Sequence, residues 1–497
     1  MLMKGLLFML LSVVMLAPCA VAQNLASDYT EYTLEGYIDK ALERSNDVKN
    51  AKSSYLSAYW EYRSFKSSFL PSLNLSARFP EYINTISPVQ QNDGTFKYVP
   101  QNYFNEKLVL SIDQKVGLTG GTFSIESNLE RRDDFEATIQ TTYKALPIGI
   151  TYWQNLFGVN WMKWQKRIDP LKYEEARRSY LYTRETAILT AINRFFDLAI
   201  AQQNLKVAKV NLKNADTLYT ISKGRFKLGS ISESDVMQME LSKLNAEMTL
   251  SQRLIELEDA QNKFRSFLGI SEKRELRLVV PSRVPEMILS YDKVLEQARK
   301  NNPDIVRFNR QVLEAERWLE ENRKETGFTA NLKATVGFNQ NALELTDTYK
   351  GIKPSQTASI SISVPILDWG QRRGKIKMAQ SNLDLVKGKV EQSQIEFDQN
   401  IFVKVMRFNQ MGQKYRIASK SDTIAQLRYK VSMDRFIAGK ISVLDLNVAL
   451  SEKDNANSSY IYTLKDFWWY YFDLRRVALY DFEKSKGLEA DYESLIR

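Results

Sequence analysis

The chain has 497 residues but a single cysteine, Cys19, and no histidine. One cysteine cannot form an internal disulfide framework, so a large core or an assembly of chains must hold the fold together. Without histidine there is no His-based catalytic triad, and a preferred ligand of zinc and iron sites is missing. We also find no glycine-rich phosphate loop and no acidic metal loop, so we predict no enzyme activity, no cofactor and no metal site.

Long hydrophobic runs are missing after Val21, since no stretch approaches the roughly 18 apolar residues of a spanning helix. If the chain crosses a membrane, it must do so as β-strands. The early apolar run at 5–16 follows Lys4 and precedes Ala20-Val21-Ala22, which is typical of a secretory signal peptide cleaved after Ala22. Alternatively, Cys19 is a lipid-modified N-terminus, because the four residues that end at it loosely resemble a lipobox.

The formal net charge is +10, with 69 lysines and arginines against 59 acidic residues. A basic balance can indicate nucleic-acid binding. Here the lysines are interleaved with glutamates along helical segments, and an exported protein rarely meets nucleic acid. We therefore interpret them as solvated helix faces and predict no nucleic-acid partner.

The sequence repeats itself at a fixed offset. The motif RFKLGSIS at 225–232 returns 210 positions later as RFIAGKIS at 435–442, and Asp235 returns as Asp445. A second constant offset pairs Ala41, Asp47, Asn74 and Leu75 with Ala298, Asp304, Asn331 and Leu332. We therefore predict two copies of one unit. The predicted segments are a signal peptide at 1–22, a first repeat at 23–268, a linker at 269–290, a second repeat at 291–486 and a tail at 487–497.

Each copy reads in the same order: helix, strands, very long helix, turn, long helix. Periodicity predicts first helices at 34–66 and 291–324, and very long helices at 171–226 and 371–436. A helix of about 65 residues would reach on the order of 100 Å. Apolar heptads broken by one four-residue step predict coiled-coil packing in the last of these helices, along Ile376, Leu383, Val390, Phe397, Ile401, Phe408 and Tyr415.

Strands are predicted where apolar and small polar residues alternate, at 73–79, 332–338 and 357–366. In a membrane barrel the apolar set would face lipid and the polar set the lumen. The first copy has further strand material: a hairpin at 108–116 and 122–129 around Gly120-Gly121, and a strand at 148–153. This surplus hairpin either enlarges the membrane wall or sits outside it.

These features together resemble the TolC family of outer-membrane efflux ducts, over nearly the whole chain after the signal. The specific motifs are Phe226-x-x-Gly229, its copy Phe436-x-x-Gly439, and VPILDWGQRR at 364–373, which looks like the family's strand-to-helix junction. The resemblance implies a mainly α-helical fold with membrane β-strands: a homotrimer with a duplicated coiled-coil tunnel and one shared twelve-stranded β-barrel. Independently, two to four strands from each half cannot close a membrane barrel, because eight strands is about the smallest closed form.

The resemblance implies a passive exit duct in the outer membrane of a Gram-negative-type bacterium, with a periplasmic extension. Its partners would be outer-membrane lipid, a periplasmic adaptor and an inner-membrane pump of an efflux or type I secretion system. The alternative function is a secreted or surface helical pore-former or adhesin without pump partners. An exported enzyme on a helical scaffold is a further rival with no supporting motif. The sequence names neither the cargo nor the class of pump.

The turn motifs form the first candidate site. Gly229 and Gly439 are predicted left-handed helix caps. Capping boxes are predicted at 232–235 and 442–445. The resemblance adds that these turns are the periplasmic tips, where the tunnel closes and the adaptor docks. It makes Asp445 an aperture residue and Asp235 a gate link, and a ring of three Asp445 carboxylates would favour cations and raise its own pKa. The predicted tip contacts are Phe226, Gly229, Ile231, Ser232, Phe436, Gly439, Ile441 and Ser442.

Tryptophans beside cations form the second candidate site, where strands pass into helices. Such pairs suit a membrane interface, with rings at headgroup depth and cations on phosphates. The alternative is ordinary packing of tryptophan under a helix start. The predicted interface residues are Trp161, Lys163, Trp164, Lys166, Arg167, Trp369, Arg372, Arg373 and Lys375. The aromatic run at 467–472 is predicted to pack inside the helical wall.

Overall fold

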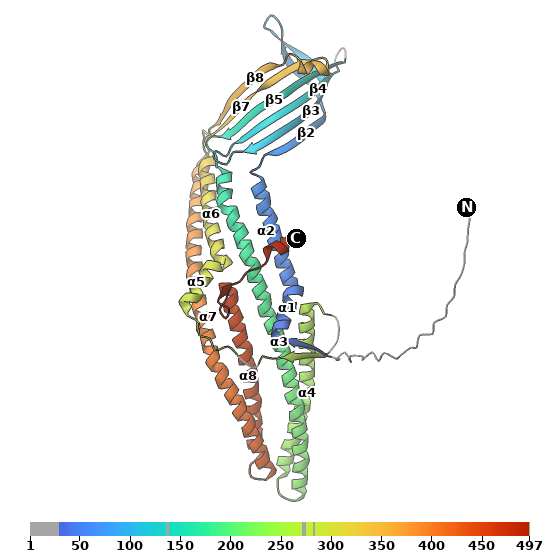
Figure 1. The fold of residues 1–497 in the computed structure, drawn as a ribbon, viewed down its shortest axis with the longest axis vertical. Coiled ribbons are helices and arrows are strands. Elements are labelled where there is room, and N and C mark those ends of the chain that lie inside the picture. Colours follow the sequence, from blue (N-terminus) through green and yellow to red (C-terminus); the bar gives the residue numbers. More distant parts are fainter. Residues whose placement is uncertain (1–28, 136–138, 271–274, 282–283, 497) are drawn as a thin grey trace, which may run out of the picture.

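The computed structural model describes residues 29–135, 139–270, 275–281 and 284–496. The molecule is elongated and mainly helical, with a curled sheet at one end and two helical hairpin tips at the other (Figure 1). The predicted signal peptide, with its cleavage after Ala22 and the alternative at Cys19, lies outside the described residues. Among the helices described, none is both long and apolar enough to cross a membrane.

Two helical hairpins of equal length build most of the molecule. Helices α3 (Trp161–Lys227) and α7 (Gln371–Ile437) have 67 residues each, and α4 (Glu233–Leu268) and α8 (Val443–Ala478) have 36 each. At about 1.5 Å per residue, α3 and α7 are each about 100 Å long. Helix α3 begins ten residues before the predicted start, because the Asn160 side chain caps it by accepting from the Lys163 N–H at 3.0 Å.

The two predicted first helices are each broken near their first third. The breaks give α1 (Leu34–Arg44), α2 (Asn46–Ser67), α5 (Tyr291–Asn301) and α6 (Pro303–Glu325). Ser45 and Asn302 sit at the breaks, and each side chain accepts from the N–H two residues later, at 3.2 and 2.9 Å. Their side-chain oxygens start the second helix, so the chain can turn without leaving these amides unpaired.

One antiparallel sheet collects all the long strands. These are β2 (Ser72–Gln90), β3 (Phe96–Lys115), β4 (Thr122–Asp134), β5 (Gln140–Asn155), β7 (Thr329–Ala342) and β8 (Lys353–Ser363). Their order is β2-β3-β4-β5-β7-β8, so the surplus hairpin β3–β4 lies within the sheet. A twelve-stranded barrel shared by three chains needs four strands from each chain. Over the residues that the structure describes, the sheet of this chain has six strands, because a second hairpin is inserted between β2 and β5.

The largest core lies midway along the helices, near the parallel pair β1 (Tyr29–Thr33) and β6 (Glu275–Val279). The prediction for the aromatic run is confirmed there, because Phe467, Tyr471 and Phe472 are buried. Short elements complete the chain: η1 (Leu345–Tyr349), β9 (Tyr480–Asp481), β10 (Lys486–Gly487) and α9 (Tyr492–Ile496).

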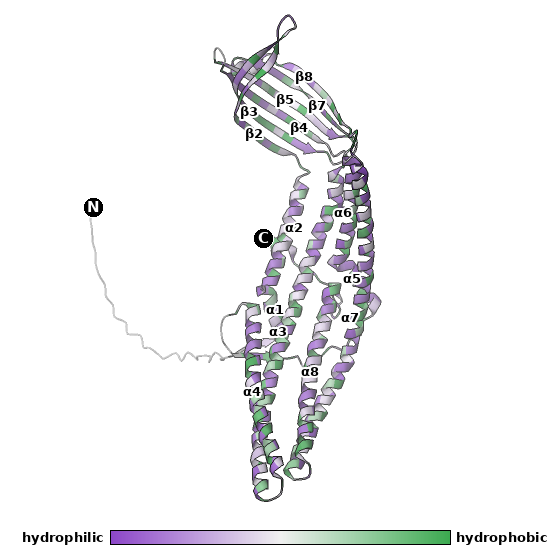
Figure 2. Ribbon diagram, turned by 180° about the vertical axis from the view of Figure 1, so that it is seen from behind, coloured by the Kyte–Doolittle hydropathy of each residue, from purple (hydrophilic) through white to green (hydrophobic). Residues whose placement is uncertain are grey.

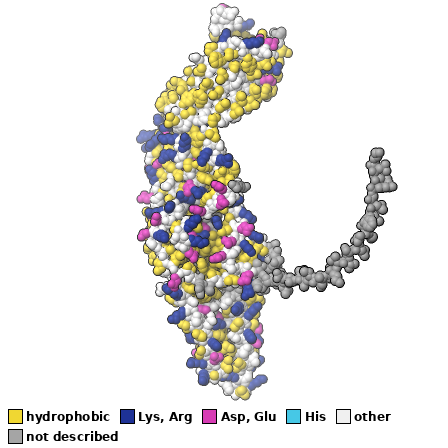
Figure 3. Space-filling model, viewed as in Figure 1, with side chains coloured by type: hydrophobic (Ala, Val, Ile, Leu, Met, Phe, Trp, Pro, Cys, Tyr) yellow, Lys and Arg dark blue, Asp and Glu magenta, His cyan; other side chains and the backbone are white. Residues whose placement is uncertain are grey.

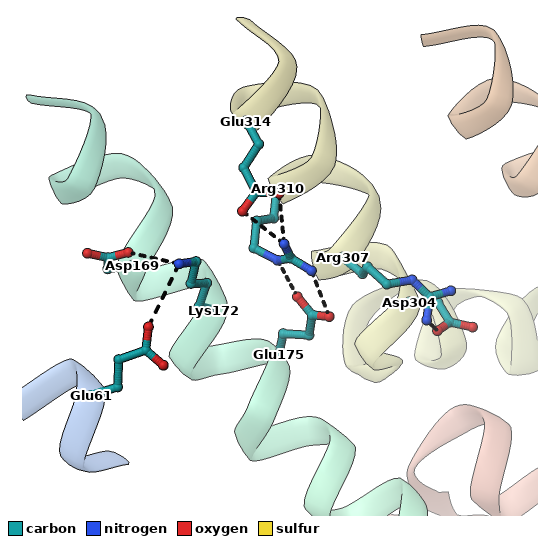
Figure 4. Close-up of polar contacts among 8 residues, drawn as sticks. All are labelled: Glu61, Asp169, Lys172, Glu175, Asp304, Arg307, Arg310 and Glu314. Carbon is teal, nitrogen blue, oxygen red and sulfur yellow. Dashed lines mark hydrogen bonds and ion pairs between the residues drawn. The ribbon is translucent and has the colours of Figure 1, made fainter. Parts of the chain in front are cut away.

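The helices form a single layer whose order changes along the molecule. Near the sheet the neighbours run α2, α3, α6, α7, and towards the tips they run α4, α3, α8, α7 (Figure 1). Ion pairs join the upper helices side to side (Figure 4). Arg310 of α6 binds Glu175 of α3 at 2.6 Å, and Lys172 of α3 lies 3.8 Å from Glu61 of α2. The hydrogen bond to Glu175 raises the pKa of Arg310 above its ordinary value, as expected for a cation held by a carboxylate.

Candidate functional site

The two hairpin tips have the same backbone geometry. Gly229 and Gly439 have φ values of 66° and 75°, the left-handed region in which glycine carries no Cβ penalty. In both turns the N–H that follows the glycine donates to an arginine carbonyl at 2.9 Å: Ser230 to Arg225, and Lys440 to Arg435. This is the six-to-one hydrogen bond of a Schellman cap. The predicted glycine caps are therefore present in both copies.

Each tip then opens the next helix with a complete capping box. The Ser232 hydroxyl accepts from the Asp235 N–H at 3.2 Å, and the Asp235 carboxylate accepts from the Ser232 N–H at 3.1 Å. Ser442 and Asp445 repeat both distances. The Ser442 hydroxyl holds the pKa of the Asp445 carboxyl below its usual value within this chain. That direction is opposite to the rise that mutual repulsion in a ring would produce.

The duplicated phenylalanines at the tips differ in environment. Phe436 is only 3% exposed and packs with Leu218, Met239 and Leu446, whereas Phe226 is 44% exposed. Ile441 is half-buried against the same cluster. The prediction that Phe436 contacts an adaptor directly is therefore contradicted in this conformation, because its ring fills the core of the tip. Phe226 remains available at the surface.

Arg225 connects the two tips, a contact that the sequence did not reveal. Its guanidinium donates to the Phe436 carbonyl at 3.3 Å and lies 5.8 Å from the centre of that ring. The accepting carbonyl is at the C-terminal end of α7, where the helix dipole is negative, and it also accepts from the Gly439 N–H at 2.9 Å. The first hairpin therefore caps the last turn of the long helix in the second.

Further polar contacts join the hairpins above the tips. Asn211 of α3 donates to Asp454 of α8 at 2.7 Å and accepts from Lys453 at 3.1 Å. Asn214 donates to the Tyr429 hydroxyl of α7 at 3.1 Å. Together with Arg225, these side chains make a row of inter-hairpin contacts along the lower part of α3.

The sheet has one apolar face and one polar face. Register pairing places one rung of directly opposed residues across all six strands, and every member is polar: Ser72, Asp113, Ser124, Thr151, Thr335 and Thr357. The adjacent rung points to the other face and is apolar in five strands of six: Leu73, Ile112, Ile125, Ile150, Val336 and Gln356. Hydrophobic and hydrophilic residues thus alternate along the strands (Figure 2), and one face is largely hydrophobic (Figure 3). This alternation is the pattern of strands with lipid on one side and water on the other.

The apolar band has a defined upper limit. On β3 it stops at Leu108, and the preceding residues are charged on both faces. Glu106 and Lys107 lie opposite Arg131 and Glu130, at 3.9 and 3.8 Å between charged atoms. Consecutive charges on both faces do not suit hydrocarbon, so this level of β3 and β4 is suited to water.

Cations gather where the helices meet the sheet, as Figure 3 shows just below the sheet. The exposed residues at this junction include Lys163, Lys166, Arg167, Arg372, Arg373 and Lys375. Trp369 is 89% exposed and has a φ of 51°, just before the start of α7. Trp161 is partly exposed, with the Arg317 guanidinium 5.3 Å from its ring centre.

Trp164 departs from the predicted interface role. It is only 6% exposed, packs with Val159 and Ile168, and donates from its indole N–H to Glu320 of α6 at 2.8 Å. Ordinary packing under a helix start, the alternative for this position, is therefore the correct description. The side chain is one turn into α3 and faces α6, so its ring is enclosed between the two helices.

Comparisons with known proteins agree with this architecture. Residues 294–464 match the family model described as outer membrane efflux protein. No curated protein matches the chain closely enough to count as a relative. Among solved structures, the CmeC outer membrane channel of Campylobacter jejuni has a TM-score of 0.64 and 16% identity, covering 93% of this chain and 88% of that one.

Two further structures of outer membrane proteins are similar over most of their length. The open state of the MtrE outer membrane channel of Neisseria gonorrhoeae has a TM-score of 0.60 and 15% identity, covering 92% of this chain and 91% of that one. The outer membrane protein VceC of Vibrio cholerae has a TM-score of 0.57 and 15% identity, covering 92% and 97%. At these identities the likeness establishes the shared fold. The mainly helical fold with a curled sheet, expected from the resemblance, is confirmed.

Proposed function

We propose that this chain belongs to the outer membrane efflux protein family and is the channel subunit of an outer-membrane exit duct. It conducts substrates passively, and the energy for transport comes from a partner pump. The observation that carries the proposal is a sheet with one apolar face, mounted on helical hairpins about 100 Å long that end in two matched tips.

The assembly is a homotrimer that meets a periplasmic adaptor and an inner-membrane pump. The repeats at 23–268 and 291–486 place two similar hairpins from each chain around one tunnel. The signal peptide directs export and is removed after Ala22. The exposed lysines and arginines at the sheet–helix junction lie against headgroup phosphates, with Trp369 and Trp161 at the same depth.

The tips carry the gate and the docking surface. Asp445 lines the aperture, and Asp235 links the first hairpin to the gate. The surfaces offered to the adaptor are the exposed parts of the turns, with Phe226 as the apolar anchor. An exposed aromatic ring flanked by polar groups is a common anchor in protein interfaces.

Two adjacent residues of β8 give a direct test of the membrane wall. Ile360 belongs to the apolar face and Ser359 to the polar face. Ile360→Lys puts a charge into lipid, which costs about 2–4 kcal/mol at the bilayer midplane. We expect it to abolish the trimer in native mass spectrometry and the current across planar bilayers, and to sensitise cells to the pump's substrates. Ser359→Lys should retain the trimer, the current and the resistance of cells to these substrates. Monomers without current from the unsubstituted chain would refute the proposed function.

The aperture is tested by a second matched pair. Asp445→Asn and Asp235→Asn remove the same capping carboxylate from tips of equal geometry. Only Asp445→Asn is expected to lower the cation-over-anion permeability ratio, measured from reversal potentials in a salt gradient. Equal permeability ratios in both variants would show that Asp445 does not line the aperture.

A further inference from the structure

The six-stranded sheet ends in two open edges. Within the described residues, β2 pairs only with β3, and β8 pairs only with β7. Apolar side chains continue to both edges, at Leu73 and Leu75 on β2 and at Ile360 and Ile362 on β8, and all four are exposed. A row of unpaired N–H and C=O groups beside such side chains is not tolerated in hydrocarbon, where each unpaired group costs several kcal/mol.

The directions of the edge strands are complementary. All five strand pairs are antiparallel, so successive strands in the sheet alternate in direction. With six strands in that order, β2 and β8 run in opposite directions. A second copy that places its β8 beside β2 therefore continues the same antiparallel pattern, and the polar and apolar faces continue with it.

The inserted hairpin β3–β4 is built as part of the lipid-facing wall. Its apolar residues Ile112 and Ile125 lie directly opposite each other and continue the apolar rung from β2 to β5. On the other face Asp113 accepts from Asn74 of β2 at 2.7 Å and from Ser124 of β4 at 2.5 Å. A hairpin lying outside the wall would not continue both the apolar face and the polar face of the neighbouring strands.

The width of the helical layer agrees with six strands from each chain. Four helices, α2, α3, α6 and α7, lie side by side next to the sheet. At about 9–10 Å between axes they occupy about 38 Å of circumference. Six strands about 4.8 Å apart, tilted by about 40°, also occupy about 38 Å, whereas four strands would occupy only about 25 Å.

We infer that both sheet edges bind second copies of this chain, β2 to β8, and that three copies close one wall of eighteen strands. This rests on the proposed function for the trimer and the membrane. An eighteen-stranded wall of that tilt has a backbone diameter of about 36 Å, against about 24 Å for twelve strands. The inserted hairpin thus widens the exit without any change in the helical hairpins.

Cysteine pairs test the edges, because residues 20–497 contain no cysteine. Leu75→Cys in β2 is combined in turn with Ala358→Cys, Ile360→Cys and Ile362→Cys in β8. We expect oxidation of membranes to cause loss of the monomer band and a covalent trimer for one of these registers. Leu110→Cys in β3, combined with the same three partners, should stay monomeric, because β3 lies inside the sheet.

Labelling of single cysteines tests whether β3 is in the wall. Leu110→Cys should react only with a membrane-soluble maleimide, and Ser111→Cys only with a water-soluble one. Val336→Cys and Thr335→Cys in β7 provide the matched control pair on opposite faces. Native mass spectrometry of the full chain gives the number of copies.

The outcomes separate this inference from the proposed function. Trimers that crosslink from β2 to β8, with β3 labelled in the same alternating pattern as β7, support eighteen strands. Conducting trimers whose two β3 cysteines both react from water, or that fail to crosslink in every register, overturn the inference but leave the duct. Dimers would close twelve strands and overturn the count. Monomers without current would overturn both.

Discussion

If the two hairpins of a chain separate when the duct opens, the Arg225 contact between their tips predicts a measurable bias towards the closed duct. The bond to the Phe436 carbonyl is 3.3 Å long and partly exposed, so we assign it about 0.5–1.5 kcal/mol. The ring contact at 5.8 Å adds about 0.5 kcal/mol. If the three Arg225 contacts of a trimer, one in each chain, break in one opening step, Arg225→Ala removes about 3–6 kcal/mol of stabilisation from the closed state. At 1.4 kcal/mol for each factor of ten, the ratio of open to closed channels rises by about 100-fold or more.

Single-channel recording in planar bilayers measures that ratio directly. The matched control is Lys223→Ala, which removes one positive charge from the same helix turn. Lys223 lies over the Tyr219 ring of its own helix at 4.7 Å, so its loss spares the contact between tips. An open fraction that is unchanged in Arg225→Ala, or equally raised in both variants, would refute the role of the link.

Three further predictions concern the tips and the core. Gly439→Ala should raise the open fraction more than Gly229→Ala in the same recordings, because both have positive φ but only a Cβ at Gly439 would meet the Arg225 guanidinium, at 2.5 Å. Arg475→Met should lower the free energy of unfolding in denaturant by about 3–5 kcal/mol, because the buried Glu185 carboxylate loses its ion-pair partner. Glu185→Gln in the same chain should restore most of that loss. Folding lowers the pKa of the Asp445 carboxyl below its ordinary value of 3.8, so the capping bonds contribute their full stability at any pH above that value. The contribution is lost as the pH falls through the lowered pKa, so hydrogen exchange at 440–446 should accelerate only below about pH 4.

Helical parts of the molecule were largely predictable from the sequence, because periodicity and capping are local signals. The seam of α7 was found at Leu383, Ile401 and Phe408, all of which are buried. Both capping boxes were found because their partners lie three residues apart. Helix α3 was predicted to start at Leu171, ten residues too late, because the helix begins at Trp161 and continues through Pro170.

The strands were found but cut too short. Strand β2 was predicted at 73–79 and extends to Gln90, because after Phe79 polar and apolar residues no longer alternate and the two-residue period disappears. Contacts between the two copies were missed for another reason. The Arg225 link and the burial of Phe436 depend on how one hairpin lies against the other, and no periodicity records that.

The helices of the repeat are restricted in length, whereas the sheet can gain strands, and this difference follows from their geometry. The paired helices keep equal lengths of 67 and 36 residues, since both tips must end at the same depth to meet and to be capped across by Arg225. An antiparallel wall has no such constraint around its circumference. A hairpin adds two strands, restores the original direction and leaves both edges able to pair as before. Insertion of β3–β4 is therefore the smallest change that widens the sheet while the helical hairpins and their tips stay the same.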